Sequence, residues 1–149
     1  MNKITTLSSL DDAKRELLSL KKTDNIQSKN WSPYKIFVHC SQTLEYSMTG
    51  YPVMKPKIFR STLGKIAIKK FVSQGFMKHS LSAPVPGAPD IKDSGTPKEG
   101  IDILLKSIDK FKAFNGELAP HLAFGKLSKD NYDKYFAYHI ADHFSELEY

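Results

Sequence analysis

The sequence has a single cysteine, Cys40, and it contains no internal repeat and no low-complexity tract. One thiol cannot form an internal disulfide, which argues against the disulfide-stapled scaffolds of small secreted domains. No stretch approaches the roughly 20 apolar residues that a membrane-spanning helix needs. Residues 1–10 lack the basic start and apolar run of a secretory signal. We therefore expect a cytoplasmic protein with no membrane partner.

Sustained alternation of apolar and polar residues is also absent, so the sequence gives little indication of β-strands. Hydrophobic residues make up 40% and charged residues 26% of the 149 positions, which is typical of a folded globular protein. A chain of this length is about the size of one domain and can bury a core. We expect one helical domain over residues 1–149.

The net charge is +6, which by itself admits nucleic acid, anionic surfaces or anionic small molecules as partners. Most lysines are dispersed along the chain. The grouped cations are Arg60, Lys65, Lys69, Lys70 and Lys78. No nucleic-acid-binding motif accompanies them, so we interpret this group as a solvated helix face and regard nucleic acid as an unlikely partner.

Four long amphipathic helices are predicted from the spacing of apolar residues and from signals at the helix ends. Two begin with proline behind a hydroxyl cap, at Ser32-Pro33 and at Thr96-Pro97. The predicted ranges are 9–20, 32–50, 96–116 and 128–147. Such helices bury their apolar stripes against one another, so the predicted fold class is all-α and the predicted architecture is a four-helix bundle.

A shorter helix is predicted over residues 61–74, inside the long connection between the second and third of these helices. The face of this shorter helix that we expect to be buried comprises Leu63, Ile66, Ala67 and Phe71, opposite Lys65 and Lys69. Three prolines and two glycines follow between Lys78 and Thr96, and they predict an irregular segment. The connection is thus expected to be a long crossover that carries an extra helix.

Three of the five histidines form a candidate metal site. His139 and His143 are four residues apart, so their imidazoles project from one helix face and can converge on one ion. His39 lies about 9 Å from the start of its helix, while His143 and His139 lie about 6 and 12 Å from the end of theirs. If these two helices pack antiparallel, all three imidazoles meet at one level. The spacing alone leaves open that each is a hydrogen-bonded core histidine.

Short motifs resemble the DinB-like superfamily, which includes DinB and YfiT-like proteins. The segment from Trp31 to His39, WSPYKIFVH, is similar to the start of that superfamily's metal-bearing second helix, and His139-x-x-x-His143 resembles its second ligand pair. Residues 121–128, HLAFGKLS, are similar to a His-Pro-x-Phe-Gly-Lys-Leu sequence in one uncharacterised branch. The chain departs from these patterns at Leu122 (proline there), Phe144 (often histidine there) and Cys40 (usually aliphatic there).

This resemblance, which covers nearly the whole chain, implies a four-helix bundle with a long crossover and a divalent ion held by His39, His139 and His143. Imidazole ligands favour zinc or nickel, with iron as a further candidate. Asp142 either orients an imidazole or, as we prefer, is a surface charge, because adjacent helical residues point about 100° apart. His121 is a candidate for the site entrance or for the cap of the last helix.

Further expectations concern residues outside the ligand set. Tyr132 and Phe136 are expected in the core, Cys40 is expected to be a buried inert thiol, and His79 has no partner that the sequence identifies.

Three imidazole ligands leave at least one coordination position open, as in catalytic sites. The resemblance implies a transferase that uses a low-molecular-weight thiol to attack a small molecule, with metal-assisted hydrolysis as the close second. No catalytic side chain is predicted. The alternative is a non-catalytic metal-binding or stress-related interaction protein whose contact surface is the lysine-rich helix at 61–74. The sequence leaves open whether the protein is an enzyme and whether it forms a homodimer.

Overall fold

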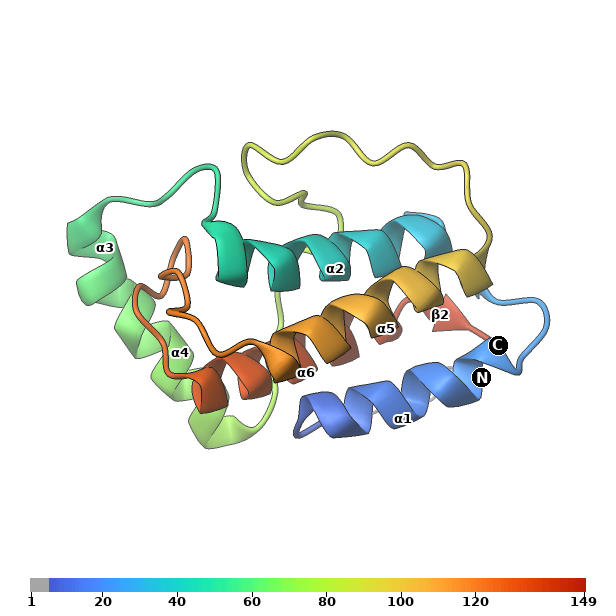
Figure 1. The fold of residues 1–149 in the computed structure, drawn as a ribbon, viewed down its shortest axis with the longest axis horizontal. Coiled ribbons are helices and arrows are strands. Elements are labelled where there is room, and N and C mark those ends of the chain that lie inside the picture. Colours follow the sequence, from blue (N-terminus) through green and yellow to red (C-terminus); the bar gives the residue numbers. More distant parts are fainter. Residues whose placement is uncertain (1–5) are drawn as a thin grey trace.

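The computed structural model describes residues 6–149, and this part of the chain is mainly helical (Figure 1). Two short strands, paired antiparallel, are its only sheet. Within the described residues the helices are α1 (Leu10–Lys21), α2 (Pro33–Thr49), α3 (Lys57–Ser61), α4 (Leu63–Gln74), α5 (Pro97–Ala113) and α6 (Lys129–Phe144), and the strands are β1 (Gln27–Ser28) and β2 (Leu147–Glu148). No helix in residues 6–149 is both long enough and apolar enough to cross a bilayer.

Each of the four long helices begins at a hydroxyl cap, and the caps at Ser32 and Thr96 are those that the sequence analysis predicts. The side-chain oxygen of the cap accepts a hydrogen bond from the backbone N–H three residues later, which satisfies a donor that the helix itself leaves unpaired. The caps are Ser9, Ser32, Thr96 and Ser128. Two of these helices, α2 and α6, carry the three histidines of the candidate site.

Two predicted helix ends are wrong. The helix α5 ends at Ala113 rather than at Gly116. The helix α6 ends at Phe144 rather than near Leu147, because Leu147 and Glu148 turn away to pair with Ser28 and Gln27. This pairing ties the chain just before α2 to the end of α6.

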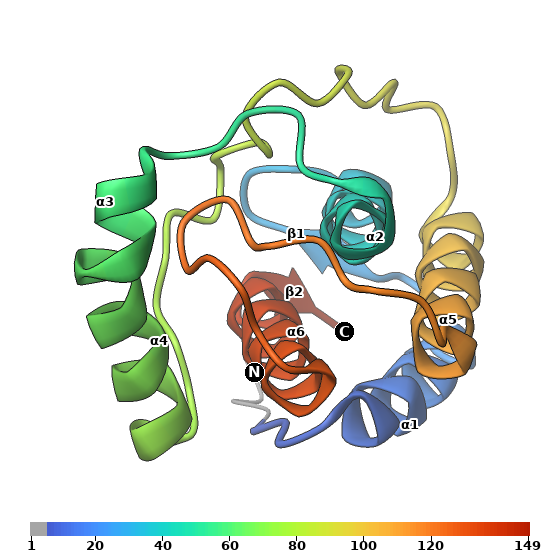
Figure 2. The ribbon, with the colours of Figure 1, turned by 60° about the vertical axis from the view of Figure 1, so that its left-hand side comes forward.

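The four long helices enclose the core. The helix α2 contacts α5 and α6, and α1 also contacts α5 and α6, so the four form a closed ring (Figure 2). The helices α1 and α6 run in one direction, whereas α2 and α5 run in the other (Figure 1). Gly100 lets α5 approach α2 closely, since a Cβ there would lie 3.2 Å from the Phe37 Cβ. Tyr132 and Phe136 lie fully buried in this core, as predicted.

Residues 50–96, here called the crossover segment, connect α2 to α5 and carry α3 and α4, and α4 packs beside α6 (Figure 2). The buried face predicted for its helix is partly wrong, because Leu63 and Ile66 are 60% and 65% exposed. The residues buried instead are Gly64 and Ile68. A Cβ on Gly64 would lie 1.8 Å from the Ala123 carbonyl oxygen, so α4 docks through its glycine side and turns Leu63 and Ile66 outward.

Candidate metal centre

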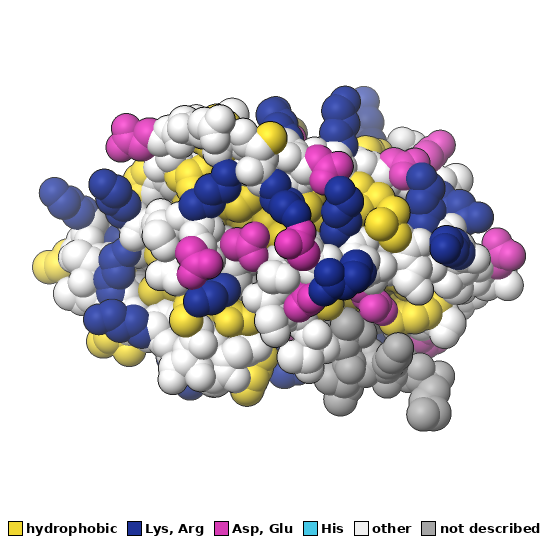
Figure 3. Space-filling model, turned by 60° about the horizontal axis from the view of Figure 1, so that its bottom comes forward, with side chains coloured by type: hydrophobic (Ala, Val, Ile, Leu, Met, Phe, Trp, Pro, Cys, Tyr) yellow, Lys and Arg dark blue, Asp and Glu magenta, His cyan; other side chains and the backbone are white. Residues whose placement is uncertain are grey.

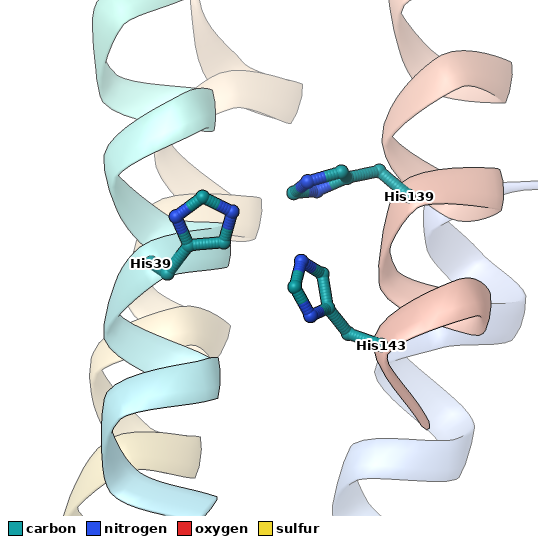
Figure 4. Close-up of side chains that lie close together, drawn as sticks. All are labelled: His39, His139 and His143. Atoms are coloured by element: carbon teal, nitrogen blue, oxygen red, sulfur yellow. The ribbon is translucent and has the colours of Figure 1, made fainter. Parts of the chain in front are cut away.

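The antiparallel packing of α2 and α6 brings three histidines to one level, as predicted, although α6 ends at Phe144 and not at Leu147, from which the predicted distances are counted. His39 projects from α2 toward His139 and His143, which project from α6 (Figure 4). One ring nitrogen from each residue lies within 4.8 Å of those of the other two. The ring centroids are 4.8 to 5.2 Å apart.

These imidazoles are buried with unsatisfied polar atoms. None of the three residues is more than 3% exposed. Both ring nitrogens of His39, and the Nδ1 atoms of His139 and His143, have no hydrogen-bond partner. A buried polar atom without a partner lowers the stability of the fold by about 1–3 kcal/mol. Three converging imidazole nitrogens are also a ligand set that divalent ions accept. The residues present therefore fit a divalent metal ion.

The protonation state of the cluster also suits a metal ion. Burial, reinforced by the neighbouring His79 imidazole, lowers the pKa of His39 from its ordinary 6.5 to about 4. Burial and the neighbouring imidazoles lower the pKa of His143 to about 2 and that of His139 well below 6.5. Imidazole must be neutral to bind a metal, and these three rings are neutral near pH 7.

Aromatic side chains hold the rings in place. Trp31 packs edge-on to His39, with centroids 5.2 Å apart, and stacks on His143 at 6.3 Å. Tyr135 stacks on His139 at 5.8 Å. Trp31 itself follows β1, and the neighbouring Asn30 amide donates a 2.7 Å hydrogen bond to the Glu146 carboxylate just beyond α6. The contact between β1 and β2 thus positions one wall of the site.

Asp142 is not the surface charge that we prefer from the sequence. The residue is 6% exposed, and its Oδ2 atom lies 2.7 Å from the Nδ1 atom of His79. The same oxygen accepts the backbone N–H of His79 at 2.9 Å. The crossover segment covers Asp142 through the backbone and the ring of His79, so the carboxylate is not exposed.

His79 is the site residue that the sequence analysis missed. Its Nε2 atom lies 3.2 Å from the Nε2 atom of His143, and its ring centroid lies 4.7 Å from that of His139. Its side chain is 22% exposed, unlike the three buried rings. Periodicity cannot place a residue in an irregular segment, so the one signal in the sequence was a further histidine without an assigned role.

His121 has a structural role beside the site. It forms a tight turn with Gly125, in which each backbone N–H donates to the other carbonyl, at 2.9 and 3.0 Å. Its Nδ1 atom accepts the N–H groups of Ala123 and Phe124, so this nitrogen is already used. His121 packs on Tyr135, which separates it from His139. It does not cap α6, because Ser128 does.

The cysteine prediction is confirmed. Cys40 is fully buried beside His39 in sequence, and burial raises the pKa of its thiol well above the ordinary value. A neutral, enclosed thiol is a poor nucleophile.

Comparisons with known proteins give a family but no activity. A family model described as "Protein of unknown function (DUF1569)" matches residues 2–149. No curated protein and no solved structure matches the chain. Since the match spans almost the whole sequence, this chain belongs to the DUF1569 family.

Proposed function

We propose that this protein is a divalent-metal-dependent enzyme of the DinB-like type, built as a four-helix bundle with a long crossover. The observation that carries the proposal is the convergence of three buried imidazoles, four of whose six ring nitrogens lack hydrogen-bond partners. The ring of four helices and the connection over residues 50–96 are consistent with that architecture. His39, His139 and His143 would hold the ion, with zinc or nickel favoured by imidazole donors and iron as a further candidate.

When bound, a divalent ion on three imidazoles supplies Lewis acidity that lowers the pKa of a water or thiol beside it. The chain's own residues set the conditions for this chemistry. Trp31 and Tyr135 cover the rings and exclude water from those sides. Among the four clustered histidines, only His79 has appreciable exposure, so a small substrate reaches the site on the side of the crossover segment.

Transfer to or from a low-molecular-weight thiol is the preferred reaction, and hydrolysis is the second. The chain offers no thiol of its own for this reaction, because Cys40 is its one cysteine and is enclosed. The thiol would therefore be a cosubstrate.

A direct test is to load the protein with zinc or nickel and to measure two model reactions in parallel. One is the substitution of the halide of an activated aryl halide by the glutathione thiolate, which releases halide, and the other is hydrolysis of an activated ester. We expect the first to depend on metal and to be lost in His139→Ala. Rates in both reactions that equal those of His139→Ala would contradict an enzymatic role for the site.

A second candidate function, binding of an acidic protein surface, is favoured by the crossover segment and its flanks. Residues 46–89 hold seven of the 22 Lys and Arg residues and none of the 16 acidic ones, so this stretch carries +7 and the rest of the chain −1. Three exposed apolar side chains, Ile58, Leu63 and Ile66, lie among these cations. Figure 3 shows basic and hydrophobic side chains side by side at the left-hand end, where Figure 1 places α3.

The two candidate functions depend on different residues. Lys65 is tied to the Lys126 carbonyl at 2.5 Å, whereas Lys69 and Lys70 are exposed. Binding of a polyglutamate probe that is weakened by Lys69→Glu with Lys70→Glu and unchanged in His139→Ala would favour the interaction role. Retention of that binding in the charge-reversed variant would count against it.

A further inference from the structure

His79 is held in one orientation by Asp142. A carboxylate only accepts hydrogen bonds, so the His79 Nδ1 atom, 2.7 Å from Asp142 Oδ2, is the nitrogen that carries the proton. The backbone N–H of His79 donates to the same oxygen at 2.9 Å, which fixes the residue as well as the ring. In the neutral ring, Nε2 then carries a free lone pair.

That lone pair is directed into the histidine cluster. The His79 Nε2 atom is 3.2 Å from the His143 Nε2 atom. The centroid of the His79 ring is 4.7 Å from that of His139 and 4.8 Å from that of His143, close to the 4.8 to 5.2 Å within the predicted ligand set. His79 thus approaches the pair on α6 from the crossover segment, as His39 approaches it from α2.

The spacing suits two donors to a common ion. Nitrogen ligands lie about 2.0–2.1 Å from zinc, so two of them in a tetrahedral shell are about 3.3–3.4 Å apart. The pairing of a carboxylate with the far nitrogen of a histidine is also the usual support for a metal-ligating imidazole. A hydrogen bond between the rings of His79 and His143 is the competing explanation, and it would leave His79 outside the coordination shell.

We propose that His79 is a fourth nitrogen donor to the ion, supplied by the crossover segment and oriented by Asp142. This inference rests on the proposed metal site. It makes the resting site a closed set of four imidazoles, three from the rigid helices and one from an irregular segment. A substrate then binds by taking the place of His79, which is the exposed member of the set.

Cobalt(II) is a suitable probe, because its visible spectrum reports the donors around it. The wild-type protein, His79→Ala, His79→Gln and Asp142→Asn would be titrated with cobalt against a competing chelator, with helicity checked by circular dichroism. Lys78→Ala is the matched control, since the Lys78 Nζ atom lies 3.8 Å from Asp142 in the same segment but is no metal ligand. Azide is then added, because it binds where a coordination position is free or held by water.

We expect one equivalent of cobalt in every variant. Affinity should fall about 10–100-fold in Asp142→Asn, at least as much in both His79 variants, and little in Lys78→Ala. Azide should change the spectrum of the His79 variants at concentrations that leave the wild-type spectrum unchanged. Equal affinity and an equal azide response in wild type and in folded His79 variants would overturn the inference and leave the three-histidine site intact. Absence of cobalt and zinc binding by the wild type would instead overturn the proposed function on which it rests.

Discussion

The helical framework (α1, α2, α5 and α6) and the crossover segment contribute to the candidate site in different ways. The framework supplies His39, His139 and His143, none of them more than 3% exposed, from helices that pack against one another. The crossover segment supplies His79, 22% exposed, from a stretch without regular structure. The framework holds three imidazoles at fixed positions, and the crossover segment places a fourth beside them, where under the proposed function it would control access to the site.

Several contacts attach the crossover segment to the framework and to the connection between α5 and α6, which carries Leu122 and Ala123. The Lys55 N–H donates to the Leu122 carbonyl at 2.9 Å, Gly64 packs against Ala123, and His79 bonds to Asp142. Large apolar side chains are exposed on the outer face of the crossover segment, whereas few are exposed on the framework. This contrast predicts that substitutions in the two regions differ in their effect on stability.

The largest effect is expected from a cavity in the framework. Phe37 is fully buried in α2 and packs edge-on to Phe144. We expect Phe37→Ala to lower the free energy of unfolding by about 3–5 kcal/mol, because it removes buried surface and leaves a void. In Ile66→Ala, the matched change at an exposed position of α4, the loss should be within about 0.5 kcal/mol. Denaturant titration measures both, and similar losses would contradict the contrast between the regions.

Acid should destabilise the metal-free protein through the framework histidines. The pKa of His39 is about 4 in the folded state and about 6.5 unfolded, so between these pH values only the unfolded chain gains the proton. Stability is therefore present above pH 6.5 and is lost as pH falls toward 4, by about 3 kcal/mol for His39 alone. Denaturant titrations at pH 7, 5.5 and 4.5 measure this slope. A slope that is unchanged in His39→Leu would show that His39 does not contribute to it.

The attachment of α4 should be sensitive to a single methyl group. A Cβ at Gly64 would meet the Ala123 carbonyl oxygen, which is backbone and cannot rotate away. We expect Gly64→Ala to cost about 1–3 kcal/mol despite the higher helix propensity of alanine. Ser73→Ala, at an exposed position of the same helix, is the control and should be close to neutral. Equal stability of the two variants would mean that α4 does not dock as described.

The smallest effect is expected to be a gain. Both ring nitrogens of His39 are buried without partners, which disfavours the metal-free fold. We expect His39→Leu to raise the stability of the metal-free protein by about 1–2 kcal/mol at pH 7, since an apolar side chain removes the unsatisfied groups. A loss of stability in this variant would indicate that His39 serves the fold rather than a ligand.

The sequence predicted the framework well and the crossover segment poorly, for physical reasons. Helix caps such as Ser32 and Thr96, the spacing of apolar residues, and the interval from His139 to His143 are local signals, so the helices and the candidate ligands could be located from them. By contrast, the segment that covers a helix face can lie far from that helix in the sequence, so local patterns do not reveal it. Asp142 was misjudged because the segment around His79 covers it, and Leu63 was misjudged because Gly64 sets how α4 docks.

The most direct test of the account is the metal content of protein purified without chelator or histidine tag, compared with that of His139→Ala and His143→Ala. We predict about one equivalent of divalent metal in the wild type, zinc or nickel first, and its loss in both variants while helicity is retained. An absence of metal in the wild type, with no uptake from micromolar zinc or nickel, would contradict the central claim and leave the cationic face of the crossover segment as the better guide to function.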